Sequence, residues 1–75
     1  MSKLPVVSGK ELIKVLEKAG FVVLRQKGSH VSMEKRERDV CWKTIVPMHR
    51  EVRPGTLHDI LKQSGLTRDD LIKLL

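Results

Sequence analysis

The first clear pattern in the chain is helical and begins at Ser8. Ser8 and Glu11 have the spacing of a capping box, in which each side chain accepts a hydrogen bond from the other residue's backbone amide. Apolar positions then recur at helical spacing, with charged positions on the other side. These apolar residues are Leu12, Val15, Leu16 and Ala19. Gly20 stands where helices commonly end in a left-handed residue, so the pattern predicts a helix over residues 9–19.

The positions after this helix follow strand patterns. Residues 21–24 are mostly β-branched or aromatic, which favours a strand, and residues 26–28 have the composition of a turn. Residues 29–35 alternate between apolar and polar, as expected of a half-buried strand. Val31 and Met33 share one face of that strand, and His30, Ser32 and Glu34 share the other. If the apolar face packs against helices, the histidine faces outward.

A third strand is expected after a charged segment. Residues 34–39 are a run of charged residues and are interpreted as a solvated hairpin loop. Residues 41–46 predict a strand, which Pro47 ends because proline cannot donate to a sheet ladder. The pattern does not decide which face of this strand is buried. Trp42, Thr44 and Val46 share one face, and Cys41, Lys43 and Ile45 share the other.

Two helices are expected in the rest of the chain. Residues 48–53 read as a polar loop, and a helix opens at Pro54 and ends at Gly65. Its apolar stripe consists of Leu57, Ile60 and Leu61. Thr67 caps a last short helix over residues 68–74. The order α-β-β-β-α plus a short C-terminal helix predicts an α+β fold, with a three-stranded antiparallel sheet whose helices pack on one face and leave the other open.

The length of the chain is consistent with such a fold, and its composition gives a strong positive net charge. The chain has 75 residues, which leaves room for one domain with one compact core. Fifteen Lys and Arg against nine Asp and Glu give a net charge of +6. Such a charge attracts nucleic acid, membrane surfaces and acidic proteins, so charge alone does not choose the partner. Part of it forms a stripe on the first predicted helix, Lys10, Lys14 and Lys18, which is either a solvated face or a track for an RNA backbone.

The sequence gives no sign of a disulfide, a structural metal site or a membrane segment. Cys41 is the only cysteine, and the three histidines match no standard metal motif. The first seven residues lack the apolar run of a signal peptide, and no stretch is long and apolar enough to span a bilayer. We therefore expect a cytoplasmic protein with no metal and no cofactor.

His30 is the candidate for acid–base chemistry. An imidazole exchanges protons near neutral pH, and His30 lies close in sequence to Arg25 and Lys27, with Lys10 as a further cation. Beside cations that hold a phosphodiester, it is able to take the proton from a ribose 2′-hydroxyl, whose oxygen then attacks the adjacent phosphorus. Lys or Arg would stabilise the charge that develops on the phosphoryl oxygens. The alternative is that this histidine is an ordinary surface residue.

The other polar candidates are weaker. His49, next to Arg50, suits a phosphate contact, whereas His58 is interpreted as a solvated helix residue. Ser29 and Ser32 flank the candidate catalytic histidine, but no third group that would orient a serine–histidine pair is apparent. With only two aromatic residues in the chain, base stacking is poorly supported.

Six short segments carry a resemblance to a known family. They are Ser-Gly-Lys-Glu at 8–11, Gly-Phe at 20–21, Arg-Gln-Lys-Gly-Ser-His at 25–30, Val-Pro-Met-His at 46–49, Pro-Gly-Thr-Leu at 54–57 and Ile-Leu-Lys-Gln-Ser-Gly-Leu at 60–66. In this order they resemble the HicA toxin family, and they extend over almost the whole chain. The main departure is residues 34–43, a charged segment with a tryptophan where members often carry a short glycine-containing turn. Residues 1–75 are thus expected to form a single HicA-like domain.

The resemblance to HicA implies a double-stranded-RNA-binding-domain-like fold and a function. Such proteins are toxins of type II toxin–antitoxin systems that cleave mRNA without a ribosome or a metal. The family's catalytic histidine falls on His30. The residues expected to bind RNA are Lys10, Arg25, Lys27, Gly28, Ser29 and His49. The partners it implies are mRNA and an acidic HicB-like antitoxin that covers the active face, with no membrane and no small-molecule cofactor.

Two other functions are consistent with the residues alone. One is a non-catalytic RNA-binding module on the same fold, which binds RNA in a salt-sensitive way without cleaving it. The other is a protein-interaction adaptor whose positive surface serves only an acidic partner. The adaptor would show no RNA affinity at physiological salt.

Overall fold

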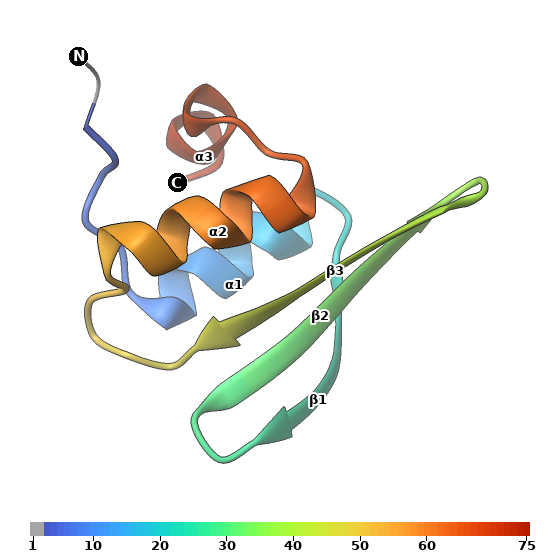
Figure 1. Cartoon of the computed structure of the whole chain (residues 1–75), viewed down its shortest axis with the longest axis horizontal. Coiled ribbons are helices and arrows are strands. Elements are labelled where there is room, and N and C mark those ends of the chain that lie inside the picture. Colours follow the sequence, from blue (N-terminus) through green and yellow to red (C-terminus); the bar gives the residue numbers. More distant parts are fainter. Residues whose placement is uncertain (1–2) are drawn as a thin grey trace.

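A computed structural model describes residues 3–75 of the chain. Its elements are α1 (Gly9–Lys18), β1 (Val22–Lys27), β2 (His30–Glu37), β3 (Val40–Pro47), α2 (Pro54–Ser64) and α3 (Arg68–Leu74). The strands form one antiparallel sheet in the order β1-β2-β3. Figure 1 shows the helices gathered on one side of the sheet, with the far end of β2 and β3 projecting beyond them. The α+β fold with an α-β-β-β-α order and an extra C-terminal helix is therefore confirmed.

Helix α1 begins where the sequence predicts and ends one residue earlier, at Lys18, with Ala19 as its C-cap. The Ser8 hydroxyl accepts a hydrogen bond from the Glu11 amide at 3.0 Å, and the Glu11 carboxylate accepts one from the Ser8 amide at 2.9 Å. The helix buries Leu12, Val15 and Leu16 in the core. Gly20 then turns the chain toward the sheet with a φ of 101°, a conformation that glycine adopts at no steric cost.

The sheet has one covered face and one open face. Val31 and Met33 of β2 pair with Val46 and Thr44 of β3, and these four buried residues form the covered face. Helix α2 packs along β3, and α1 also contacts that strand. The open face carries Arg25 and Lys27 of β1, His30, Ser32 and Glu34 of β2, and Cys41, Lys43 and Ile45 of β3. The structure thus decides what the sequence pattern left open, because the side of β3 that carries Trp42 is the covered one.

Strand β1 differs from the expectation in its position and its exposure. All six of its residues are exposed, because β1 lies at the edge of the sheet away from the helices (Figure 1). Phe21, expected within the strand, precedes it and is buried in the core. The strand continues through Lys27, so the turn consists of Gly28 and Ser29 and not of residues 26–28.

The charged segment before β3 is mostly strand, so the expected loop over residues 34–39 is wrong. Strand β2 continues through Glu37, the turn is only Arg38 and Asp39, and β3 starts at Val40. Three ion pairs connect the side chains of this hairpin: Glu34 with Arg36 at 3.5 Å, Glu34 with Lys43 at 3.8 Å, and Lys35 with Glu37 at 3.7 Å. The hairpin projects beyond the helices, so neither of its faces has to be apolar. The period-two alternation that marks a half-buried strand is therefore absent there.

Helices α2 and α3 complete the covered side. Helix α2 ends at Gly65, whose φ of 71° reverses the chain, and the Trp42 ring lies only 3.0 Å from where a side chain at this glycine would begin. Helix α3 begins at a second capping box. The Thr67 hydroxyl accepts from the Asp70 amide at 3.1 Å, and the Asp70 carboxylate accepts from the Thr67 amide at 2.9 Å.

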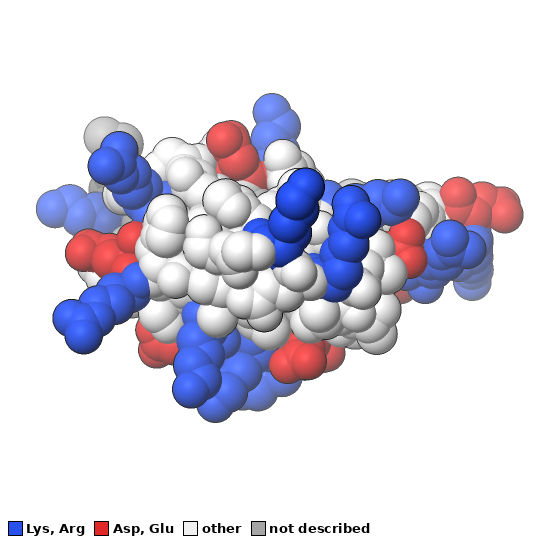
Figure 2. Space-filling view, turned by 90° about the horizontal axis from the view of Figure 1, so that it is seen from below, with Lys and Arg blue, Asp and Glu red and all other residues white. Residues whose placement is uncertain are grey.

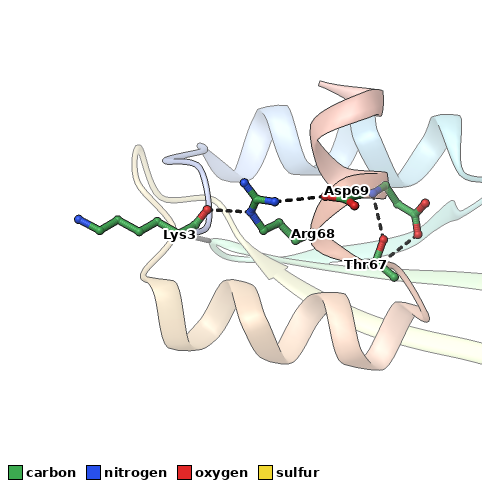
Figure 3. A network of polar contacts seen from close by, with 5 residues as sticks. Lys3, Thr67, Arg68 and Asp69 are labelled. Atoms are coloured by element: carbon green, nitrogen blue, oxygen red, sulfur yellow. Dashed lines mark hydrogen bonds and ion pairs between the residues drawn. The ribbon is translucent and has the colours of Figure 1, made fainter. Parts of the chain in front are cut away.

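Helix α3 also holds the start of the chain. The Arg68 guanidinium donates to the Lys3 carbonyl at 3.0 Å and pairs with Asp69 at 3.2 Å (Figure 3). Leu71, on the same helix, is fully buried in the core. Within residues 3–75, no helix is both long and apolar enough to cross a bilayer.

Candidate functional site

Three segments that the sequence singled out meet at one end of the sheet. The Met48 amide donates to the Ser29 carbonyl at 2.6 Å, which ties the loop after β3 to the β1–β2 turn. The Gly9 amide donates to the His49 carbonyl at 2.9 Å, which ties the start of α1 to the same loop. In Figure 1 this end is the lower one, opposite the projecting hairpin. Main-chain bonds thus hold in place the backbone around the candidate residues.

The contact at Gly9 is close enough to exclude a side chain. A Cβ at this position would overlap the Pro47 carbonyl and lie 2.9 Å from the Met48 Cα. Glycine therefore lets α1 approach the end of β3, whose last residue pairs with His30 across the sheet. The helix start therefore requires glycine, because α1 lies so close to the end of β3.

The β1–β2 turn brings His30 opposite a lysine. Gly28 occupies the first position of a two-residue turn with a φ of 60°, as glycine does in type II′ hairpin turns. Nothing lies within 4 Å of its missing Cβ, so glycine is needed here for its backbone conformation. The turn places Lys27 directly across from His30, and cross-strand neighbours have Cβ atoms about 5 Å apart.

His30 lies in a shallow hollow on the open face. The hollow measures about 370 Å³ and is lined by Arg25, Lys27, His30, Ser32 and Ile45. The histidine is exposed, as the strand alternation predicted. Within residues 3–75, neither of the two cations pairs with a carboxylate. The hollow therefore offers an exposed imidazole and two free positive charges to an anionic ligand.

The remaining candidates divide between a second hollow and the turn. Lys10 and His49 line a hollow of about 250 Å³ together with Ser8, Met48 and Arg50. The two hollows share no lining residue, and the bond between Met48 and Ser29 links the loop of the second to the turn beside the first. Ser29 and Gly28 line neither hollow and contribute through the turn itself. The structure thus brings Arg25, Lys27 and His30 together in one hollow, whereas Lys10 and His49 line another.

The lysine stripe of α1 lines two different hollows. Lys10 belongs to the hollow with His49, whereas Lys14 and Lys18 line a separate one at the other end of the helix. Lys18 donates to the Leu74 carbonyl at 3.0 Å and so helps to hold α3. His58 is exposed on α2 and lines a hollow that contains none of the other candidates.

Farther along the open face, Glu34 and Cys41 form a pair. The Cys41 thiol donates to the Glu34 carboxylate at 3.1 Å. This hydrogen bond is the main cause that lowers the pKa of Glu34, and the cations Arg36 and Lys43 add to it. The same bond raises the pKa of Cys41. The thiol is therefore kept protonated, which disfavours a role as a nucleophile.

Two members of the site could not be assigned from the sequence. Ile45 lines the hollow of His30, and Leu24 lines a larger hollow of about 610 Å³ beside it. The alternation in residues 41–46 puts Ile45 on one of two faces, but choosing the face requires the register with β2 and the position of the helices. Leu24 lies at a register shift in β1, between Val23 and Arg25, which the sequence does not reveal.

The charge around this end of the molecule is mainly positive. Figure 2 views the molecule from below, the side on which the β1–β2 turn lies in Figure 1, and shows many Lys and Arg side chains, with groups of Asp and Glu among them, around a broad uncharged area. Within residues 3–75, no three His, Cys, Asp or Glu side chains converge on a potential metal site.

Comparison with known proteins identifies one family. Residues 9–66 match the family model described as HicA toxin of bacterial toxin-antitoxin. The match extends from the start of α1 to just past the end of α2, and helix α3 lies outside it. A search of curated proteins finds no match to the chain.

Proposed function

The chain belongs to the HicA toxin family of bacterial toxin–antitoxin systems, and on that basis we propose that it is a metal-independent, ribosome-independent endoribonuclease that cleaves mRNA with His30 as its general acid/base. The observation that carries the proposal is the composition of one hollow. It combines the exposed imidazole of His30 with Arg25 and Lys27, two cations that no carboxylate neutralises. Membership of a toxin family supplies the biological role that the geometry alone does not.

The proposed reaction is an internal transesterification. A phosphodiester of RNA binds with its non-bridging oxygens toward Arg25 and Lys27. His30 takes the proton from the ribose 2′-hydroxyl, and the 2′-oxygen forms a bond to phosphorus. The bond from phosphorus to the 5′-oxygen of the next nucleotide breaks. The products are a 2′,3′-cyclic phosphate and a free 5′-hydroxyl, and the two cations stabilise the charge that develops on the phosphoryl oxygens.

The leaving 5′-oxygen needs a proton from a second donor. Lys27, directly across from His30, and His49, in the neighbouring hollow, are the candidates by position. We assign Lys10 to the RNA backbone beyond the scissile phosphate, because it lines a separate hollow, and His49 takes the same role if Lys27 is the proton donor. Gly28 and Ser29 form the turn between Lys27 and His30, and the hydrogen bond from the Met48 amide to the Ser29 carbonyl holds this turn in place.

An antitoxin partner follows from membership of a toxin–antitoxin family. We propose that this partner is an acidic HicB-like protein that covers the open face near His30. The net charge of +6 supports an acidic partner. We also propose that α3 belongs to the same domain as the matched region, because Leu71 is buried in the common core.

A non-catalytic RNA-binding module on this fold is the second candidate. One observation favours it: within residues 3–75, no hydrogen bond to a protein group orients the His30 ring. In catalytic triads a third group holds the base in position, and none of the described residues does so here. A ring held only by its backbone would have to be positioned by the RNA.

Product analysis distinguishes the two candidates. Purified protein treated with EDTA is incubated with a single-stranded RNA labelled at one end. The nuclease gives fragments that end in a cyclic phosphate and a 5′-hydroxyl, whereas the binding module leaves the RNA intact and only shifts it in a gel. Cleavage that requires added metal, or fragments with a 5′-phosphate, would contradict the proposed chemistry.

A further inference from the structure

The hollow of His30 continues into a larger one. The larger hollow, of about 610 Å³, is lined by Leu24, Arg25, Ser32, Met33, Lys43, Thr44, Ile45 and Gln63. It shares Arg25, Ser32 and Ile45 with the hollow of His30. The two therefore form one continuous groove that leads from the imidazole along the sheet.

The groove is lined by both apolar and cationic side chains. Leu24 and Ile45 are half exposed, at 51% and 54%, and α2 reaches the groove through Gln63. Arg25 and Lys43 line the same groove. Beyond Lys43 lies Glu34, whose ion pair with that lysine at 3.8 Å introduces a negative charge. A negatively charged strand that enters the groove at His30 would thus be attracted by cations as far as Lys43 and repelled by Glu34 beyond it.

We propose that this groove binds the nucleotide next to the scissile phosphate of a single-stranded RNA, with its base against Ile45 and Leu24 and its backbone near Arg25 and Lys43. The inference rests on the proposed function, because it takes RNA to be bound at His30. Charge complementarity and continuity with that hollow select RNA as the occupant. A base must be unstacked to reach apolar side chains on a sheet, so the substrate at this position is single-stranded.

Binding of an uncleavable RNA tests the groove separately from catalysis. The probe is a fluorescent single-stranded octanucleotide with 2′-O-methyl groups, which lack the nucleophilic hydroxyl, and affinity is measured by anisotropy. Removing an apolar contact to a base weakens binding, so Ile45→Ala is expected to raise Kd about five- to tenfold. Ile72→Ala is the matched control, because it removes the same atoms from another half-exposed isoleucine, on α3. This control is expected to bind as the wild type does.

A second pair of probes locates the contact. An abasic nucleotide next to the cleavage position should weaken binding to the wild type but not to Ile45→Ala, because that variant has already lost the contact. A duplex of the same sequence should bind both proteins alike. Equal affinities of wild type and Ile45→Ala for the single strand would overturn the inference. If that variant instead lost antitoxin binding, the groove would be assigned to the protein partner.

Failure of the groove and failure of the nuclease give different results. A wild type that binds the methylated strand through Ile45 but leaves unmodified RNA intact contradicts the nuclease and supports the groove. A wild type that cuts unmodified RNA, with Ile45→Ala equal to it in binding and cutting, contradicts the groove alone.

Discussion

The two faces of the sheet use alternate positions of the same strands for different purposes. On the covered face, Val31 and Met33 are at most 3% exposed and pack under the helices. On the open face, His30 and Ser32 alternate with them and line the candidate site. Stability and the proposed chemistry are therefore separated by one position along the strand. A substitution on either face should affect one property and leave the other nearly intact.

The largest expected difference between the faces is in stability. Met33→Ala removes a fully buried side chain and should lower the free energy of unfolding by about 2–5 kcal/mol. Ile45→Ala, on the open face, should change it by no more than about 0.5 kcal/mol. Urea unfolding followed by the fluorescence of Trp42, the only tryptophan, measures both. Equal losses from the two variants would contradict the division into a covered and an open face.

Gly9→Ala should lower both stability and RNA cleavage, because this glycine lies where α1 of the covered side contacts the end of β3 next to the candidate site. A Cβ there meets the Pro47 carbonyl and the Met48 Cα, and overpacking costs about 1–3 kcal/mol. The shift also moves the end of β3 that pairs with His30, so RNA cleavage should fall together with stability. Gly55→Ala, at a glycine of α2 with open space around it, is the control and should lower neither. A stable, fully active Gly9→Ala variant would show that the close approach is not required.

Helix α3 belongs to neither face of the sheet, so a substitution there should change stability and leave RNA cleavage unchanged. Thr67→Ala removes the hydroxyl that caps this helix and should cost about 1 kcal/mol, with cleavage unchanged. For a domain of this size, the melting temperature should fall by about 4–8 °C. Loss of cleavage in a folded Thr67→Ala variant would contradict the assignment of the chemistry to the open face.

The same cap predicts a pH dependence. Hydrogen bonds from the Thr67 backbone and side chain hold the pKa of Asp70 below its ordinary value. The stability that the Asp70 carboxylate contributes is therefore present above the unfolded-state pKa and is lost as the pH falls through the lower folded-state pKa. Asp70→Asn should be less stable than the wild type at pH 7, and the gap should narrow below about pH 4. Asp69→Asn, in the same helical turn, is the control. A gap that stayed constant across this range would contradict the role of Asp70.

Much of this fold could be predicted from local sequence signals. The capping boxes at Ser8 and Thr67 act over three residues, so both helix starts were predictable. The alternation around Val31 likewise identified the face that carries His30. The exposure of β1 and the site position of Ile45 were not predictable, because they depend on how far the helices extend over the sheet and on the pairing of the strands. The charged hairpin was misjudged because a strand exposed on both faces has no apolar alternation.

The most direct test of the account is cleavage of RNA by His30→Ala. The matched control is His58→Ala, which removes an exposed histidine of α2 that lines no part of the candidate site. Both variants and the wild type are compared for melting temperature, cleavage of single-stranded RNA in EDTA, and growth arrest on induction. We expect His30→Ala to melt as the wild type does while cleavage and growth arrest are lost, and His58→Ala to retain both. A folded His30→Ala variant that still cuts RNA at the wild-type rate would contradict the central claim.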